Sequence, residues 1–196
     1  MTERLTRDAG QAFPVYLTAV AGLLFLALAY FAVGQAAADR NSAQGAADAA
    51  ALAAATETRT QLGRVLLENI NDVESWNDLL KGQMYSTGPS CASASRFAAR
   101  NSARVKSCSP LGLPRNGYRV EVRLSESVGS TIIPGTESTY ASASATAVVD
   151  PRCTVSSEEE AETIELNCKG RTITVDPDDP DPLPPLDRMF TVRLVD

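Results

Sequence analysis

The stretch FPVYLTAVAGLLFLALAYFAV, from Phe13 to Val33, decides the architecture of this 196-residue chain. It contains no charged residue, and about 20 helical residues span the roughly 30 Å hydrocarbon core of a bilayer. Pro14 suits the first helical turn, and Tyr16 and Tyr30 flank the apolar run as interfacial rings do. The sequence therefore predicts a transmembrane helix.

The residues around this stretch predict its orientation and processing. Arg4 and Arg7 precede it, and only Arg40 follows closely. The positive-inside rule therefore predicts a single-pass protein of the cell membrane with a cytoplasmic N-terminus and an extracytoplasmic C-terminal domain. The alternatives are cleavage after Ala38, as in a signal peptide, or a prepilin-type cut after Gly10. An uncleaved anchor is favoured because the apolar region of a signal peptide is only about 7 to 15 residues long.

Alanine, the best helix former, dominates the proline-free stretch from Gly34 to Leu67. We expect the transmembrane helix to continue through this stretch as a stalk. Small residues four positions apart allow helices to approach closely in membranes. This spacing occurs in the pairs Ala32/Ala36 and Ala43/Ala47. These four alanines are predicted to pack against other helices, from partner subunits or from copies of the same chain.

Three segments around the span carry a resemblance to a known family: RDAGQA at 7–12, RNSAQ at 40–44 and AADAAALAAA at 46–55. They resemble the N-terminal region of TadE/TadG-like proteins of Flp (tight-adherence, type IVb) pilus assembly. The resemblance implies a non-enzymatic membrane component of pilus assembly or related secretion machinery, similar to a minor pilin or pseudopilin. Other pilin-like or Tad assembly subunits would be its partners. Two family features are missing: Val15 stands where a prepilin site has glutamate, and no DxSxS motif of a von Willebrand A domain occurs.

The rest of the chain predicts a small α+β head with an antiparallel sheet. Apolar spacing predicts amphipathic helix within 64–80, with Trp76 in the core, and a short helix over 93–101 with Phe97 and Ala98 facing inward. Strand patterns, apolar and polar residues in alternation, occur at 118–124, 139–149, 163–167, 171–175 and 190–195, with a further strand starting at 105–108. The small alanines of 139–149 leave room for a helix to pack closely, and Lys169-Gly170 predicts a hairpin.

Four cysteines in an exported domain predict two disulfides. A helix over 91–101 advances about 15 Å, and a strand over 103–108 returns by a similar distance. Cys91 would therefore lie beside Cys108, which leaves Cys153 to pair with Cys168. A zinc site made of all four is the alternative, but it would need closer pairs such as CxxC, which do not occur.

Composition excludes several classes of function. The chain has 18 Lys and Arg against 24 Asp and Glu, a net charge of -6, which argues against binding nucleic acid. It has no histidine, so no imidazole base or histidine metal ligand can exist. No catalytic residue, metal ligand or cofactor is assigned, and we expect no enzyme. The alternative function is a membrane-tethered envelope binding protein whose acidic head recognises a ligand or a cation.

Together these patterns predict an α+β protein in which a long N-terminal transmembrane, pilin-like helix is followed by a small disulfide-stapled head with an antiparallel sheet. The expected segments are a cytoplasmic tail (1–12), the transmembrane helix (13–34), an alanine-rich helical stalk (35–82), the head (83–175), an Asp/Pro-rich connector (176–187) and a C-terminal strand (188–196). The strand is expected to join its own sheet, with a neighbour's sheet edge as the alternative. The connector aspartates Asp176, Asp178, Asp179 and Asp181 are the alternative calcium ligands.

Overall fold

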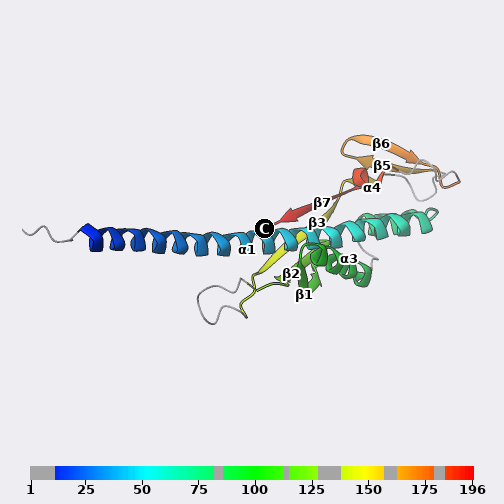
Figure 1. Cartoon of the computed structure of the whole chain (residues 1–196). Coiled ribbons are helices and arrows are strands. Elements are labelled where there is room, and N and C mark those ends of the chain that lie inside the picture. Colours follow the sequence, from blue (N-terminus) through cyan, green and yellow to red (C-terminus); the bar gives the residue numbers. More distant parts are fainter. Residues whose placement is uncertain (1–11, 82–85, 113–114, 128–137, 157–162, 179–183) are drawn as a thin grey trace, which may run out of the picture.

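One helix runs through most of the molecule. The computed structural model describes residues 12–81, 86–112, 115–127, 138–156, 163–178 and 184–196, and its helix α1 (Ala12–Glu68) contains 57 of them. At 1.5 Å per residue this helix is about 85 Å long. Its first part stands alone, and all other described elements gather around its second part (Figure 1). The prediction that the helix continues unbroken beyond Val33 to about Leu67 is confirmed.

The remaining elements form an α+β head, as the sequence predicts. Two described sheets are antiparallel: a four-stranded sheet in the order β1-β2-β3-β7 and a three-stranded sheet in the order β4-β5-β6. The elements after α1 are α2 (Val73–Leu80), α3 (Thr87–Arg100), β1 (Ala103–Pro110), β2 (Gly117–Leu124), β3 (Ser142–Pro151), β4 (Cys153–Val155), β5 (Ile164–Cys168), β6 (Arg171–Val175), α4 (Leu186–Met189) and β7 (Phe190–Val195).

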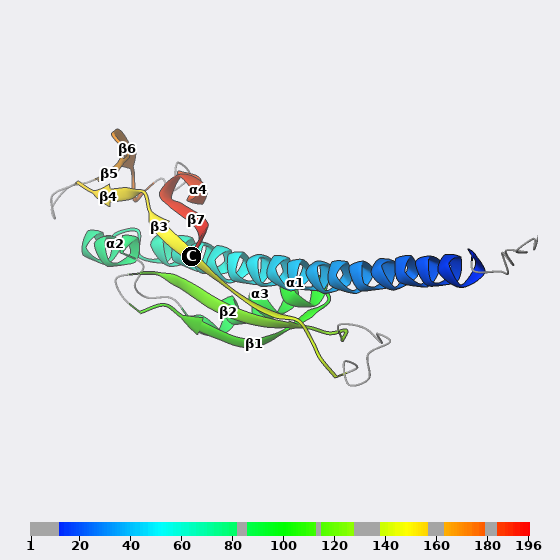
Figure 2. The same cartoon turned by 90° about the vertical axis from the view of Figure 1, so that its left-hand side faces the viewer.

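The four-stranded sheet packs on α1, and α3 packs against both α1 and β1 (Figure 2). Strand β2 shows why: Tyr118, Val120 and Val122 are fully buried, whereas the alternate residues Arg119 and Arg123 are exposed. This is the period-two pattern of a strand with one face on the core. The second half of α1 is therefore the central element of the head, and it packs against both α3 and the sheet.

Alanine allows α1 to pack closely against the sheet. Along α1, Ala47, Ala50 and Ala54 are all fully buried, and β3 contributes Ala145 and Ala147 to the same core. Methyl-sized side chains on both elements let the helix lie close to the strand, so that the interior reaches close packing without large side chains. The expectation that the alanines of this strand admit a closely packed helix is confirmed.

Larger side chains fill the end of the head that lies far from the N-terminus. Leu62, Leu66 and Trp76 are fully buried there. The Trp76 Nε1 donates a hydrogen bond of 2.9 Å to the carbonyl oxygen of Asn69, which satisfies its one polar atom. The prediction that Trp76 is a core residue is confirmed. The core is thus graded, with alanine near the apolar end of α1 and leucine, tryptophan and phenylalanine at the far end.

Three features differ from the sequence-based expectations. Many residues between 43 and 66 of the expected alanine-rich stalk (35–82), such as Ala47 and Leu62, are in the core of the head, because α3 and the sheet cover them. Phe97 was expected to face inward, but it is 38% exposed with the Arg100 guanidinium 5.1 Å from its ring centroid, and Ala98 is the buried residue. The head contains two sheets, and a short helix, α4, precedes the last strand.

The last strand belongs to the chain's own sheet. Strand β7 pairs antiparallel with β3, with Phe190 opposite Pro151 and Val195 opposite Thr146. Phe190 is buried, whereas Leu194, four residues further along the strand, is 39% exposed. The expected own-sheet pairing is therefore confirmed.

Candidate functional site

The first turns of α1 expose a continuous apolar surface. Between Phe13 and Val33 the large apolar side chains are 39–83% exposed, with Tyr30 the most exposed. Burying one such side chain is worth about 1.5–3 kcal/mol, so this surface would be strongly unfavourable in water. Within the described residues, this helix is the one stretch long and apolar enough to cross a membrane. The predicted transmembrane helix is therefore a candidate membrane span in the structure.

A short neck joins this span to the head. Residues 34–42 are mostly exposed and include Gln35 and Asp39, whose side chains form a hydrogen bond of 3.4 Å. The first fully buried residue is Ala43. Nine residues at 1.5 Å each separate the span from the head by about 14 Å. Because the neck is helical throughout, it connects the two parts rigidly.

The four alanines predicted to pack against other helices do not form one shared external face. Ala43 and Ala47 are 0% exposed because the chain's own head covers them. Ala32 is partly exposed and Ala36 is exposed. Ala43 and Ala47 are therefore occupied within the chain, and of the two pairs only Ala32 and Ala36 are open to another helix.

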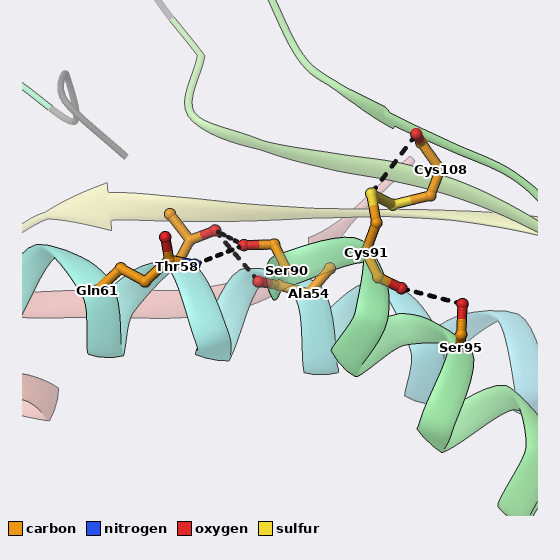
Figure 3. Close-up of a disulfide and its surroundings, with 7 residues drawn as sticks. All are labelled: Ala54, Thr58, Gln61, Ser90, Cys91, Ser95 and Cys108. Carbon is orange, nitrogen blue, oxygen red and sulfur yellow. Dashed lines mark hydrogen bonds between the residues drawn. A yellow bond between two sulfur atoms is a disulfide. The ribbon is translucent and has the colours of Figure 1, made fainter. Parts of the chain in front are cut away.

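A buried polar cluster that the sequence patterns did not predict joins α3 to α1 (Figure 3). Thr58 donates to the carbonyl oxygen of Ala54 at 3.2 Å, so its hydroxyl oxygen must accept from Ser90, which lies 2.9 Å away. Gln61 donates to Ser90 at 3.1 Å, and its carbonyl oxygen accepts from the backbone N–H of Ser86 at 3.1 Å. Every polar group of this cluster is thus satisfied. The i,i+3 spacing of Thr58 and Gln61 among buried apolar residues was its signal in the sequence.

Both disulfides are present in the predicted pairing. Cys91 on α3 is bonded to Cys108 on β1, with Cα atoms 5.9 Å apart. Cys153 on β4 is bonded to Cys168 on β5, with Cα atoms 4.1 Å apart. The first joins the helix and the sheet that both pack against α1, next to the buried polar cluster (Figure 3). The second joins two strands of the small sheet.

The acidic connector lies only partly within the described residues. Asp176 accepts a hydrogen bond of 2.9 Å from the backbone N–H of Asp178, whereas Asp179 and Asp181 are outside the described part of the chain. Among the residues that the structure describes, no three acidic or cysteine side chains are grouped as metal ligands.

The fold thus defines a class: a protein with one candidate membrane span whose helix continues into the core of a disulfide-bonded α+β head. Residues 10–57 match the model of a family described as putative Flp pilus-assembly TadE/G-like. The match confirms the resemblance and covers the span, the neck and the first turns enclosed by the head. No curated protein and no solved structure matches the chain.

Proposed function

We propose that this protein is a non-enzymatic, membrane-anchored component of Flp pilus assembly or of a related secretion machinery, similar to a minor pilin or pseudopilin. Its N-terminus would be cytoplasmic and its head extracytoplasmic. The observation that carries the proposal is the continuity of α1, because the family match at 10–57 and the helix both run from the span into the head core.

The proposed mechanism is helix packing in the membrane combined with presentation of the head. Ala32 and Ala36 lie at the end of the span and at the start of the neck, and they remain open to a neighbouring helix. Small residues at this spacing let two helix backbones approach closely. A partner subunit or a second copy would pack there, while Ala43 and Ala47 hold the chain's own head.

Cysteine cross-linking in native membranes tests this packing. All four native cysteines are in disulfides, so Ala32→Cys or Ala36→Cys introduces the single free thiol. We expect oxidation to give adducts with a pilin-like subunit or with a second copy. Gly34→Cys is the matched control, because it lies about 200° around the helix from Ala32. Adducts at Ala32 and Ala36 but not at Gly34 support the proposal, and monomers at all three positions contradict it.

A labelling experiment tests the proposed orientation. Thr154 on β4 is exposed and lies in the head. We expect a membrane-impermeant maleimide to modify Thr154→Cys in right-side-out membrane vesicles and not in sealed inverted vesicles. The opposite pattern would place the head in the cytoplasm and would refute the proposed localisation.

A further inference from the structure

A basic pocket lies at the end of the head farthest from the span, beside the small sheet and α4. Its volume is about 400 Å³, and four of the six lining residues that the structure describes are cations: Arg152, Lys169, Arg171 and Arg188. Cys168 and Ile173 are the other described lining residues, and none of the lining residues that the structure describes is a carboxylate. This concentration of positive charge is unexpected in a chain with a net charge of -6.

Separate segments of the chain hold the four cations together. The backbone N–H of Arg152 donates to the carbonyl oxygen of Met189 at 2.8 Å, which fixes the start of β4 against α4. The Cys153 sulfur lies 3.9 Å from the carbonyl oxygen of Arg188. The Cys153–Cys168 disulfide then attaches β5 at the same place.

The hairpin after β5 places the other two cations. Cys168 pairs with Arg171 across the two-residue turn Lys169-Gly170, and both turn residues have positive φ, 52° and 82°. The backbone N–H of Gly170 donates to the side-chain oxygen of Asn167 at 3.0 Å. This turn geometry is typical of tight hairpins. The arrangement of the four cations is therefore built by a disulfide, a hairpin and a backbone hydrogen bond.

None of these cations has an acidic partner within the part of the chain that the structure describes. The ion pairs found there join Lys81 to Asp78, Lys106 to Glu121 and Arg193 to Asp150. Four cations with no ion-pair partner among the described residues repel each other around one pocket, and a bound anion would relieve this repulsion. Guanidinium groups bind phosphate and carboxylate oxygens through paired hydrogen bonds, and the pocket volume lies within the usual range for small-ligand sites, about 300–1,000 Å³.

We propose that this pocket binds a soluble phosphate-bearing ligand outside the membrane. A phosphate has oxygens on several sides and as many as two negative charges, which suits cations that come from separate segments. A carboxylate has two oxygens in one plane and one charge. This binding goes beyond pilus assembly and depends on it only for the placement of the head outside the membrane.

The position of the pocket excludes the headgroups of the protein's own membrane as the source of the phosphate. Leu186 of α4 packs over Gly63 of α1, and 30 helical residues separate Gly63 from the end of the span at Val33. At 1.5 Å per residue this distance is about 45 Å. A lipid phosphate at the membrane surface cannot reach the pocket.

Binding measured with the purified full-length protein in detergent micelles tests the proposal. The probes are pyrophosphate, glucose 6-phosphate, galacturonate and vesicles of phosphatidylglycerol, at matched ionic strength. We expect both soluble phosphates to bind at least about tenfold more tightly than galacturonate, a difference of about 1.4 kcal/mol. No binding of either phosphate, equal binding of galacturonate, or binding to the vesicles alone would overturn the proposal.

Substitutions test whether this pocket is the site that binds phosphate. The double variant Arg171→Gln/Arg188→Gln should lose at least about tenfold in affinity for pyrophosphate, because charge-assisted hydrogen bonds are lost. The matched control, Arg96→Gln/Arg104→Gln, removes two exposed arginines from α3 and β1 and should change the affinity less than about twofold, since long-range effects of exposed charges are screened. Equal losses in both would indicate unspecific attraction and overturn the proposal.

A third variant covers the case in which the double variant does not fold. Lys169→Gln alters one exposed turn residue, and buried Trp76 reports folding by its fluorescence. We expect this variant to remain folded and to lose affinity for pyrophosphate. Unchanged affinity in folded Lys169→Gln would overturn the proposal, whether or not the double variant folds. Pilus assembly plays no part in this measurement. A failure of the phosphate-binding proposal can therefore be distinguished from a failure of the proposed assembly function.

Discussion

Replacing Ala47 by leucine tests whether alanine in the second half of α1 serves the chain's own head. The Ala47 side chain is 0% exposed in a core where β3 also presents alanines. Leucine adds three carbon atoms where the helix lies close to the strand. Overpacking of this kind costs about 1–3 kcal/mol, so we expect the free energy of unfolding of the head to fall by that amount.

The assay is urea unfolding of the purified protein in detergent micelles, followed by the fluorescence of Trp76. This is the chain's single tryptophan and it is fully buried in the head. With a denaturant slope of about 2 kcal/mol per molar urea, a loss of 2 kcal/mol lowers the midpoint by about 1 M.

The matched control is Ala36→Leu, the same change at an exposed position of the same helix. Leucine and alanine both favour helix, so its effect should stay within about 0.5 kcal/mol. If Ala47→Leu does not lower the midpoint more than Ala36→Leu, the packing of the head on α1 is refuted. If Ala36→Leu abolishes cross-linking to partners at Ala32→Cys without changing the midpoint, the result supports the proposal that Ala36 contacts partner helices while Ala47 packs within the head.

Three further changes test other parts of the fold in the same unfolding assay. Replacing Cys91 and Cys108 together by serine opens a loop with a sequence separation of 17 and should cost about 3 kcal/mol in the chain-entropy model; reduced wild-type protein is the comparison, and an unchanged midpoint in both contradicts the prediction. Gly117→Ala would place a Cβ against the backbone carbonyl oxygen of Ala147 and should destabilise by more than about 1 kcal/mol, whereas a neutral effect would mean that β2 and β3 lie farther apart. Phe190→Ala removes a buried ring and should cost about 3–5 kcal/mol; a loss below 1 kcal/mol would show that β7 does not close the sheet of its own chain.

Short-range patterns predicted much of this molecule. The charge-free run, the proline-free alanine stretch and the alternation in 118–124 each depend on neighbouring residues, and each gave the observed element. The disulfides followed from the same local geometry, because a helix and a returning strand of similar length bring Cys91 beside Cys108.

Long-range packing was not predictable in the same way. A run of alanine has the same small side chain all around the helix, so its sequence contains no stripe that shows which face a sheet will cover. The burial of Ala43 and Ala47 under the head is therefore visible only in the structure. Phe97 is the opposite case: it was predicted to face inward because it is apolar, but its ring lies beside Arg100 at the surface.

The candidate sites show the same limit. Arg152 and Arg188 are 36 positions apart in the sequence, and their meeting depends on the pairing of β3 with β7 and on the position of α4. The buried cluster likewise joins Thr58 to Ser90 across 32 positions. Each residue by itself resembles an ordinary surface or helix residue.

The unbroken neck also fixes the rotation of the head about the axis of α1 relative to the span. Because α1 has no break between the span and the head, the direction in which the head faces is fixed by how the span is turned within the bilayer. Each residue of an α-helix adds about 100° of rotation. One residue inserted in the neck would keep both parts folded yet turn the head by more than a quarter circle relative to the membrane partners. The number of residues in the neck therefore sets the rotation of the head relative to the span, and so determines which side of the head faces each neighbouring subunit.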